Sequence, residues 1–411
     1  MTTKQASSWT MLALTAIMTA AASRPAQADG GGRHKKRLLV SFTEGSTRAD
    51  RERAARDMGL RLVDDIDSLQ VSVLEAAGDV AEEDIVRARV QPNVVTVEED
   101  GRRNWLLESP ASFQALPMPS VESALGALVR PKPAPAPAGV VPWGVGRVNA
   151  PAAWSAGRGR GVKVAVIDTG IDCAHPDLRC DLAAGVNLVD RGSPPMDDNE
   201  HGTHVSGTIA GRGNGPKGVF GVAPAATLIP VKVLDADGAG TLSDIVEGID
   251  WATKARVDVI NMSLGGPAGS TALRRAVEKA LAAGIAVVCA AGNSGPDSDT
   301  VGFPAGYPGV IAVAASDYAD GVASFSSRGD EIAFIAPGVG ITSTVPGGGY
   351  KKESGTSMAS PHVSGLAALA VERGAKGPKG VRTALAAAAS RLPGLLSTEE
   401  GAGMVDAALL R

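Results

Sequence analysis

The sequence is poor in aromatic residues, in cysteine and in clustered positive charge. Phe, Trp and Tyr make up 3% of the 411 residues, so a core has to be built from Ala, Val, Leu and Ile. The net charge is −4 and no basic cluster is present, which argues against nucleic acid as a partner. Beyond the N-terminus no apolar segment is long enough to span a bilayer, so we expect no stable membrane span.

The three cysteines allow few disulfides. Cys173 and Cys180 are close in sequence and could close a short surface loop if the chain is exported, and two free thiols are the alternative. Cys289 lies in the apolar run "GIAVVCAAGN" and is expected to be a buried thiol.

Residues 1–28 resemble a secretory signal peptide. Lys4 precedes the apolar run "WTMLALTAIMTAAAS", and the small-residue pattern "AQA" at 26–28 ends before Asp29. An uncleaved anchor is the alternative, but the run is short and rich in small residues. No cysteine follows it that could carry a lipid. We therefore expect a secreted protein, extracellular or periplasmic.

The rest of the chain divides into three parts. Residues 29–104 predict a small α+β domain, with strands at "RLLVSF", "LQVSVLEA" and "VVTVEED" and helices at "RADRERAARDMGL" and "VAEEDIVRARV". Residues 105–141 are rich in Pro, Ala and Ser and predict an extended linker. Residues 142–411 alternate short apolar runs, such as "VKVAVID" and "VDVINMSL", with helical patterns such as "LSDIVEGIDWATKA". This alternation predicts an α/β fold with a mostly parallel sheet and helices on both faces.

Polar residues that follow the predicted strands are the first candidates for chemistry, because function gathers at the carboxyl ends of parallel strands. Asp168 ends "VKVAVID", where it could cap a turn or orient a histidine. His201 and His204 share a helix face in "NEHGTHVSGTIAG". A metal pair is one interpretation, but the zinc helix signature has its histidines four apart. A catalytic base beside a packed histidine is the better interpretation if a serine partner exists.

Ser357 lies in "SGTSMASPH", just before an apolar helix. A helix N-terminus stabilises negative charge, such as that formed when a serine attacks an amide. By itself, this serine would more often be an N-cap. Asn293 in "AAGNSG" could donate to the same oxyanion, or could simply occupy a left-handed turn.

Together these four residues follow the order Asp, His, Asn, Ser, which is the order of the subtilisins. The segments "VAVIDTGID", "HGTHVSGTIAG", "NMSLGG", "AAGN" and "GTSMASPHVSGLAAL" resemble subtilisin-family serine proteases, from Trp143 to "GAGMVDAALL". The resemblance implies a serine endopeptidase that needs no cofactor for catalysis. It makes Ser357 the nucleophile, His201 the base and Asp168 its orienting partner. Asn293 and the Ser357 N–H would form the oxyanion hole.

The resemblance also implies residues that bind the peptide substrate. A substrate strand would pair with two exposed edges, and the residue before the cut would enter a pocket of small residues that favours large apolar side chains. The edges are Ser263, Leu264 and Gly265 on one side and Gly238, Ala239 and Gly240 on the other; the pocket residues are Ala290, Gly292 and Gly302.

Many members of the family bind a structural calcium ion. Asp177 matches a ligand position, and Asn214 lies in the partner loop "GRGNGPKGV", whose Pro and Lys depart from the usual pattern. The sequence therefore leaves this site open.

The segments "RLLVSF" and "QPNVVTVEEDG" resemble a subtilisin-type propeptide, which implies an intramolecular inhibitor and folding assistant. The linker is longer than is usual in the family, so Leu106, Leu107, Phe113 and Leu116 are all candidates for the first cleavage. We expect a monomer.

Two other functions compete with an autoprocessed protease. One is a non-catalytic relative that binds peptides in the same cleft, and the other is a metal-dependent hydrolase built on His201 and His204. If His201 is a base, activity should fade below neutral pH.

Overall fold

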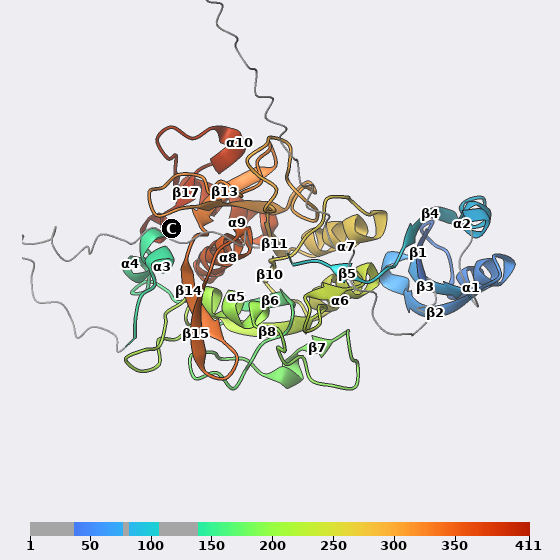
Figure 1. Cartoon of the computed structure of the whole chain (residues 1–411), viewed down its shortest axis with the longest axis horizontal. Coiled ribbons are helices and arrows are strands. Elements are labelled where there is room, and N and C mark those ends of the chain that lie inside the picture. Colours follow the sequence, from blue (N-terminus) through green and yellow to red (C-terminus); the bar gives the residue numbers. More distant parts are fainter. Residues whose placement is uncertain (1–36, 77–81, 107–138) are drawn as a thin grey trace, which may run out of the picture. The chain divides into compact units, whose positions relative to one another are not determined.

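The computed structural model describes residues 37–76, 82–106 and 139–411 (Figure 1). The predicted signal peptide and residues 107–138 of the predicted linker lie outside these ranges, as do Leu107, Phe113 and Leu116. Within the described ranges, no helix is long and apolar enough to cross a membrane.

The N-terminal domain is a four-stranded antiparallel sheet with two helices. The strands lie in the order β2-β3-β1-β4. Their bounds are β1 (Arg37–Phe42), β2 (Leu60–Ile66), β3 (Val71–Ala76) and β4 (Val94–Glu99), and the helices are α1 (Arg48–Asp57) and α2 (Glu82–Arg89). Strand β2 was absent from the sequence-based prediction because its middle residues are polar or only half-buried and break the apolar alternation.

The larger domain is built on a nine-stranded sheet. The strand order is β16-β17-β13-β12-β11-β10-β6-β8-β7, and every described pair is parallel except β16 with β17. The inner strands are continuous apolar runs because both faces of the sheet are covered. The strands are β6 (Lys163–Asp168), β7 (Val186–Asn187), β8 (Thr227–Lys232), β10 (Val259–Met262), β11 (Ala286–Ala290), β12 (Ile311–Ser316), β13 (Ile332–Pro337), β16 (Ala389–Ser390) and β17 (Met404–Val405).

Helices pack on both faces of this sheet and form two separate core clusters, as the strand–helix alternation predicts. One face carries α5 (His201–Ala210), α8 (Thr356–Glu372) and α9 (Gly377–Ala387), and the other carries α6 (Leu242–Lys254) and α7 (Thr271–Ala282). Helix α8 lies in the middle of the domain (Figure 1). The remaining elements are α3 (Trp143–Arg147), α4 (Ala150–Ala153), α10 (Ser397–Glu400), the hairpin β14 (Ile341–Val345) with β15 (Gly349–Glu353), and the pair β5 (Arg103–Asn104) with β9 (Ala239–Gly240).

The strand order reverses at β6, which has β8 on one side and β10 on the other. Parallel sheets bind ligands at such a switch point, beyond the carboxyl ends of the strands. Asn261 of β10 pairs with Val166 of β6, and continuing this register brings Ser263 level with Asp168. The fold thus places the end of β6 next to the end of β10, where the polar candidates lie.

Both ends of the predicted linker belong to folded structure. Trp105 is buried, with 1% of its surface exposed, and Val140 forms a bridge with Val219. The range 105–141 that was expected for the linker is therefore too long at both ends. The reason is that these end residues find partners in the larger domain, which composition cannot reveal.

Two of the three cysteines form a disulfide and the third is a free thiol. Cys173 and Cys180 form a disulfide that closes a short loop after β6. Cys289 is a free thiol in β11, fully buried, and burial raises its pKa.

Candidate active site

Asp168 and His201 form a buried pair at the end of β6. The Nδ1 atom of His201 lies 2.8 Å from Oδ1 and 3.0 Å from Oδ2 of Asp168. Asp168 is fully buried, whereas 11% of the His201 side chain is exposed. Contact with the carboxylate makes Nδ1 the protonated nitrogen and leaves Nε2 as the acceptor.

The His201 imidazole experiences two opposing effects on its pKa. Burial alone would lower the pKa, but the Asp168 carboxylate stabilises the imidazolium through its charge and its hydrogen bond, and the net effect is a raised pKa. A positive charge on this ring is therefore accommodated.

His204 serves a different purpose on the same helix. It is fully buried, and its Nε2 atom lies 3.0 Å from the Ile341 carbonyl oxygen and 3.2 Å from that of Lys351. Burial lowers its pKa, so it stays neutral. The rings of His201 and His204 contact different partners. They therefore do not form the metal pair that was considered from the sequence.

Ser357 is the second residue of α8 and is held close to the end of β10. Its Oγ donates to the Ser263 carbonyl oxygen at 3.1 Å, and the Ser263 hydroxyl donates back to the Ser357 carbonyl oxygen at 2.9 Å. Deeper in the helix, Ser360 and Ser364 donate to Oδ1 of the buried Asn261 of β10. Sequence reasoning missed this anchor, although a polar Asn261 inside an apolar strand run was a signal.

Asn293, just after β11, faces the same helix N-terminus. Its Oδ1 accepts hydrogen bonds from the N–H of Thr356 at 3.0 Å and from the Thr356 hydroxyl at 2.9 Å, which fixes the orientation of the amide. A Cβ atom placed on Gly355 would lie 3.3 Å from Nδ2 of Asn293 and 3.6 Å from the N of Ser357. The amide nitrogen of Asn293 and the backbone nitrogen of Ser357 thus both lie close to Gly355.

The β6–α5–α8 arrangement combines a histidine in contact with a buried carboxylate, a serine at a helix N-terminus and a nearby asparagine amide. These are the parts needed for nucleophilic attack on a carbonyl.

Comparisons with known proteins agree with this geometry. The sequence model of the Subtilase family matches residues 159–403. The chain is 41% identical to Subtilisin E of Bacillus subtilis (strain 168) over 372 residues, which are 88% of this chain and 87% of the relative. It is 53% identical to Subtilisin of Bacillus pumilus over 237 residues, 57% of this chain and 85% of the relative. The chain belongs to the subtilase family.

The N-terminal part of the chain matches a second family model. The model of the Fervidolysin N-terminal prodomain matches residues 20–100. The chain is 49% identical to an Intracellular serine protease of Paenibacillus polymyxa over 236 residues, 56% of this chain and 72% of the relative. This subtilase is a serine endopeptidase that carries a prodomain.

The segment that follows the matched prodomain pairs with the subtilase domain. Strand β5 pairs with β9, the N–H of Trp105 donates to the Gly238 carbonyl oxygen, and the N–H of Gly265 donates to the Trp105 carbonyl oxygen, both at 3.0 Å. The indole Nε1 of Trp105 donates to the Gly240 carbonyl oxygen at 3.0 Å. Residues Arg103–Trp105 therefore contact both of the edges predicted for substrate.

Prodomain carboxylates also meet the starts of two subtilase helices. Asp100 accepts from the N–H and the hydroxyl of Ser243 at the start of α6, both at 2.8 Å. Glu98 accepts from the N–H groups of Thr271 and Ala272 at the start of α7, at 3.2 and 3.3 Å. Negative charge at these positions is favourable because a helix N-terminus is positive.

A cavity of about 490 Å³ adjoins Asn293. Of the predicted binding residues, Gly265, Gly292 and Gly302 line it together with Leu106 of the prodomain. Ala290, which was predicted for the pocket, is buried in β11 and does not line this cavity. Leu264, which was predicted as an edge residue, has its side chain buried in the core.

The cavity lining also includes an acidic residue, Asp299, which was not among the predicted pocket residues. Asp299 is exposed and has a φ of 57°, so it lies on a loop whose path the sequence pattern did not predict.

The residues proposed for calcium do not fit a cation. The Asp177 carboxylate accepts hydrogen bonds from the N–H of Asn214 at 2.5 Å, the N–H of Val219 at 2.7 Å and the hydroxyl of Tyr350 at 2.9 Å. The Asn214 amide nitrogen donates to the Pro176 carbonyl oxygen. A calcium site requires converging oxygen atoms, whereas donors converge on this carboxylate.

Proposed function

We propose that this subtilase is a secreted, autoprocessed endopeptidase in which Ser357 is the nucleophile, His201 the general base and Asp168 its orienting partner. The observation that carries the proposal is the buried Asp168–His201 contact at the switch point, where Ser357 is hydrogen-bonded to Ser263 just after the neighbouring strand β10. The raised pKa of His201 supports its ability to hold a proton during the reaction.

The reaction begins when the Ser357 hydroxyl turns from the Ser263 carbonyl toward Nε2 of His201. Oγ attacks the peptide carbonyl carbon as His201 takes the proton, and the carbonyl oxygen becomes an oxyanion. The Ser357 N–H and Asn293 Nδ2 stabilise that oxyanion. His201 then gives its proton to the leaving amine, an acyl-enzyme remains, and water hydrolyses it by the same steps.

The prodomain acts as an intramolecular inhibitor in this proposal. Its residues Arg103–Leu106 pair with the groove as a substrate strand would, which blocks access to Ser357. Leu106 touches the cavity, so we propose that the first cleavage falls at or shortly after it. The apolar segment before residue 28 supports export.

The cavity supports a preference for large apolar residues before the cut, since glycines line it and leave space. We expect little selectivity at the other substrate positions, because backbone hydrogen bonds do not depend on the substrate side chains. A cleavage profile dominated by Lys or Arg would contradict this preference and would point instead to Asp299.

The proposed function is tested by following self-processing of the full chain and by measuring which peptides of a library the enzyme cleaves. Wild type should lose its prodomain and cleave after large apolar residues, while Ser357→Ala should remain unprocessed with its fold intact. A Ser357→Ala chain that still processes itself would overturn the proposal, because another residue would then supply the nucleophile.

A further inference from the structure

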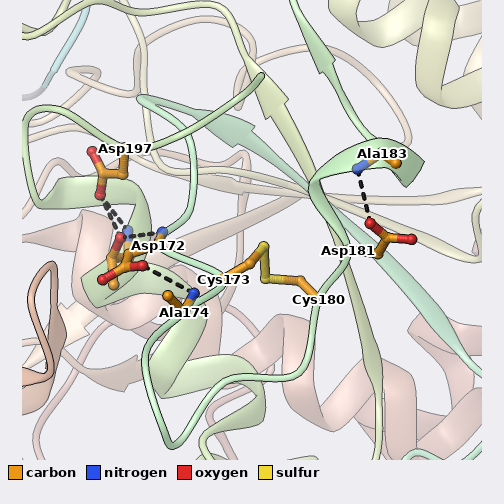
Figure 2. Close-up of a disulfide and its surroundings, with 8 residues drawn as sticks. Asp172, Cys173, Ala174, Cys180, Asp181, Ala183 and Asp197 are labelled. Atoms are coloured by element: carbon orange, nitrogen blue, oxygen red, sulfur yellow. Dashed lines mark hydrogen bonds between the residues drawn. A yellow bond between two sulfur atoms is a disulfide. The ribbon is translucent and has the colours of Figure 1, made fainter. Parts of the chain in front are cut away.

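The Cys173–Cys180 disulfide closes a loop that begins shortly after Asp168 on the same chain segment. Both half-cystines are partly exposed, so solvent reagents can reach them. Figure 2 shows that the carboxylate of Asp172, the residue before Cys173, accepts a hydrogen bond from the N–H of Ala174, while its backbone N–H faces helix α5 and Asp197. The disulfide loop is therefore adjacent to the segment that leads into His201.

A chain of buried hydrogen bonds connects this loop to helix α5. The N–H of Asp172 donates to the Thr203 hydroxyl at 3.0 Å, and that hydroxyl donates to Oδ2 of Asp197 at 2.6 Å (Figure 2). The N–H of Thr203 donates to the same carboxylate oxygen at 2.9 Å. Thr203 is fully buried and lies on the first turn of the helix that begins at His201.

Asp197 also fixes the backbone just before His201. Its Oδ1 accepts from the Thr169 hydroxyl at 2.8 Å and from the N–H groups of Asn199 and Glu200, both at 3.0 Å. Glu200 has a φ of 114°, which is unfavourable for a residue with a side chain and has to be held by its surroundings. Asp197 supplies that restraint directly beside His201.

The two segments touch backbone to backbone, so neither can shift alone. A Cβ on Gly202 would lie 2.1 Å from the Gly170 carbonyl oxygen, and a Cβ on Gly170 would lie 2.7 Å from the Met196 carbonyl group. A displacement of the segment that ends at Cys173 would therefore be transmitted to the start of α5.

We propose that the Cys173–Cys180 disulfide positions His201 for catalysis, through Asp172, Thr203 and Asp197. Thr203 and Asp197 are positioning residues, since they act through His201 rather than on the substrate. This inference rests on the proposed role of His201 as the base. It makes the turnover of the enzyme sensitive to reductant, independently of the buried Cys289.

The redox step is an ordinary thiol–disulfide exchange. A dithiol reductant breaks the S–S bond, transfers two electrons and two protons to give two thiols, and becomes a cyclic disulfide. The loop then loses its covalent closure, and Asp172 is held next to Thr203 by hydrogen bonds alone. Because small misplacements of a catalytic group are costly, we expect kcat to fall by roughly 10-fold.

The experiment compares the active enzyme recovered from the full chain before and after reduction, at a temperature well below unfolding. The expected result is a roughly 10-fold fall in kcat and in the rate of fluorophosphonate labelling, with KM for a short peptide substrate changed by less than about twofold. In Thr203→Val the connection is already broken, so reduction should change kcat by less than about twofold. Thr203→Ser keeps the hydroxyl and should behave like the wild type.

Two controls separate the alternatives. Cys289→Ser should keep the full response to reductant. If Thr203→Val does not fold, Cys173→Ser/Cys180→Ser should show the low kcat of the reduced enzyme and no response to reductant. The proposal is overturned if reduction leaves kcat of the wild type unchanged, or lowers it equally in Thr203→Val. An oxidised wild type that is not labelled at Ser357 would instead contradict the proposed function.

Discussion

At the scale of single residues, Asp168 places a negative charge beside His201. The carboxylate raises the pKa of the imidazole against the effect of burial. Below that raised pKa the ring is protonated and cannot take the proton of Ser357. We expect kcat/KM to fall as the pH drops through a midpoint above the ordinary histidine value of 6.5.

Replacing Asp168 tests the origin of this shift. Asp168→Asn removes the charge, so the acid limb of the pH–kcat/KM profile should move to lower pH, while kcat should fall on the order of 10⁴-fold because the tautomer is no longer fixed. A profile that stays flat to strongly acidic pH in the wild type would show that His201 is not the base.

The space beside Gly355 is a second residue-scale feature. A methyl group there would contact both proposed oxyanion donors, so Gly355→Ala should lower kcat with little change in KM. Asn293→Ala removes one donor and should lower kcat by about 10²–10³-fold, the size measured for the equivalent change in subtilisin, a relative. Steady-state kinetics measure both. If Gly355→Ala were as active as the wild type, the donors would not converge there.

At the scale of elements, the close packing of helix α8 against Val222 depends on Gly365. A Cβ at this position would lie 2.6 Å from Cβ of Val222, so Gly365→Ala should destabilise the fold by about 1–3 kcal/mol. Gly380 in α9 has open space, its nearest neighbour being 3.9 Å away, and Gly380→Ala should stabilise by up to about 1 kcal/mol.

Denaturant unfolding in a Ser357→Ala background, which prevents self-digestion, measures both glycine substitutions. Equal changes in the unfolding free energy for the two would contradict the packing argument, since helix propensity alone is the same for both.

Some strands and candidate site residues could be predicted from the sequence, and others could not. The buried strands β6, β8, β10, β11 and β12 were predictable because each is a continuous apolar run. Asp168, His201, Asn293 and Ser357 were predictable from motifs that follow those strands. The position of Trp105 was not, because it depends on contacts with residues far away in sequence, among them β9 and Gly265.

At the scale of the whole molecule, the loop around Asp177 predicts a stability that does not depend on calcium. Its carboxylate already accepts three hydrogen bonds from donors of the chain. A chelator should therefore change Tm by less than about 2 °C. Asp177→Asn should lower Tm by the same amount with and without calcium. A chelator-induced fall in Tm that Asp177→Asn abolishes would restore the calcium site predicted from the family.

The central claim is that Ser357 is the nucleophile of this subtilase, and covalent labelling tests it most directly. The active enzyme is treated with a fluorophosphonate and the modified residue is mapped by mass spectrometry. We expect label on Ser357 alone, none in Ser357→Ala, and unchanged labelling in Ser294→Ala, whose serine lines the nearby cavity. Label on another residue, or label that persists in Ser357→Ala, would contradict it.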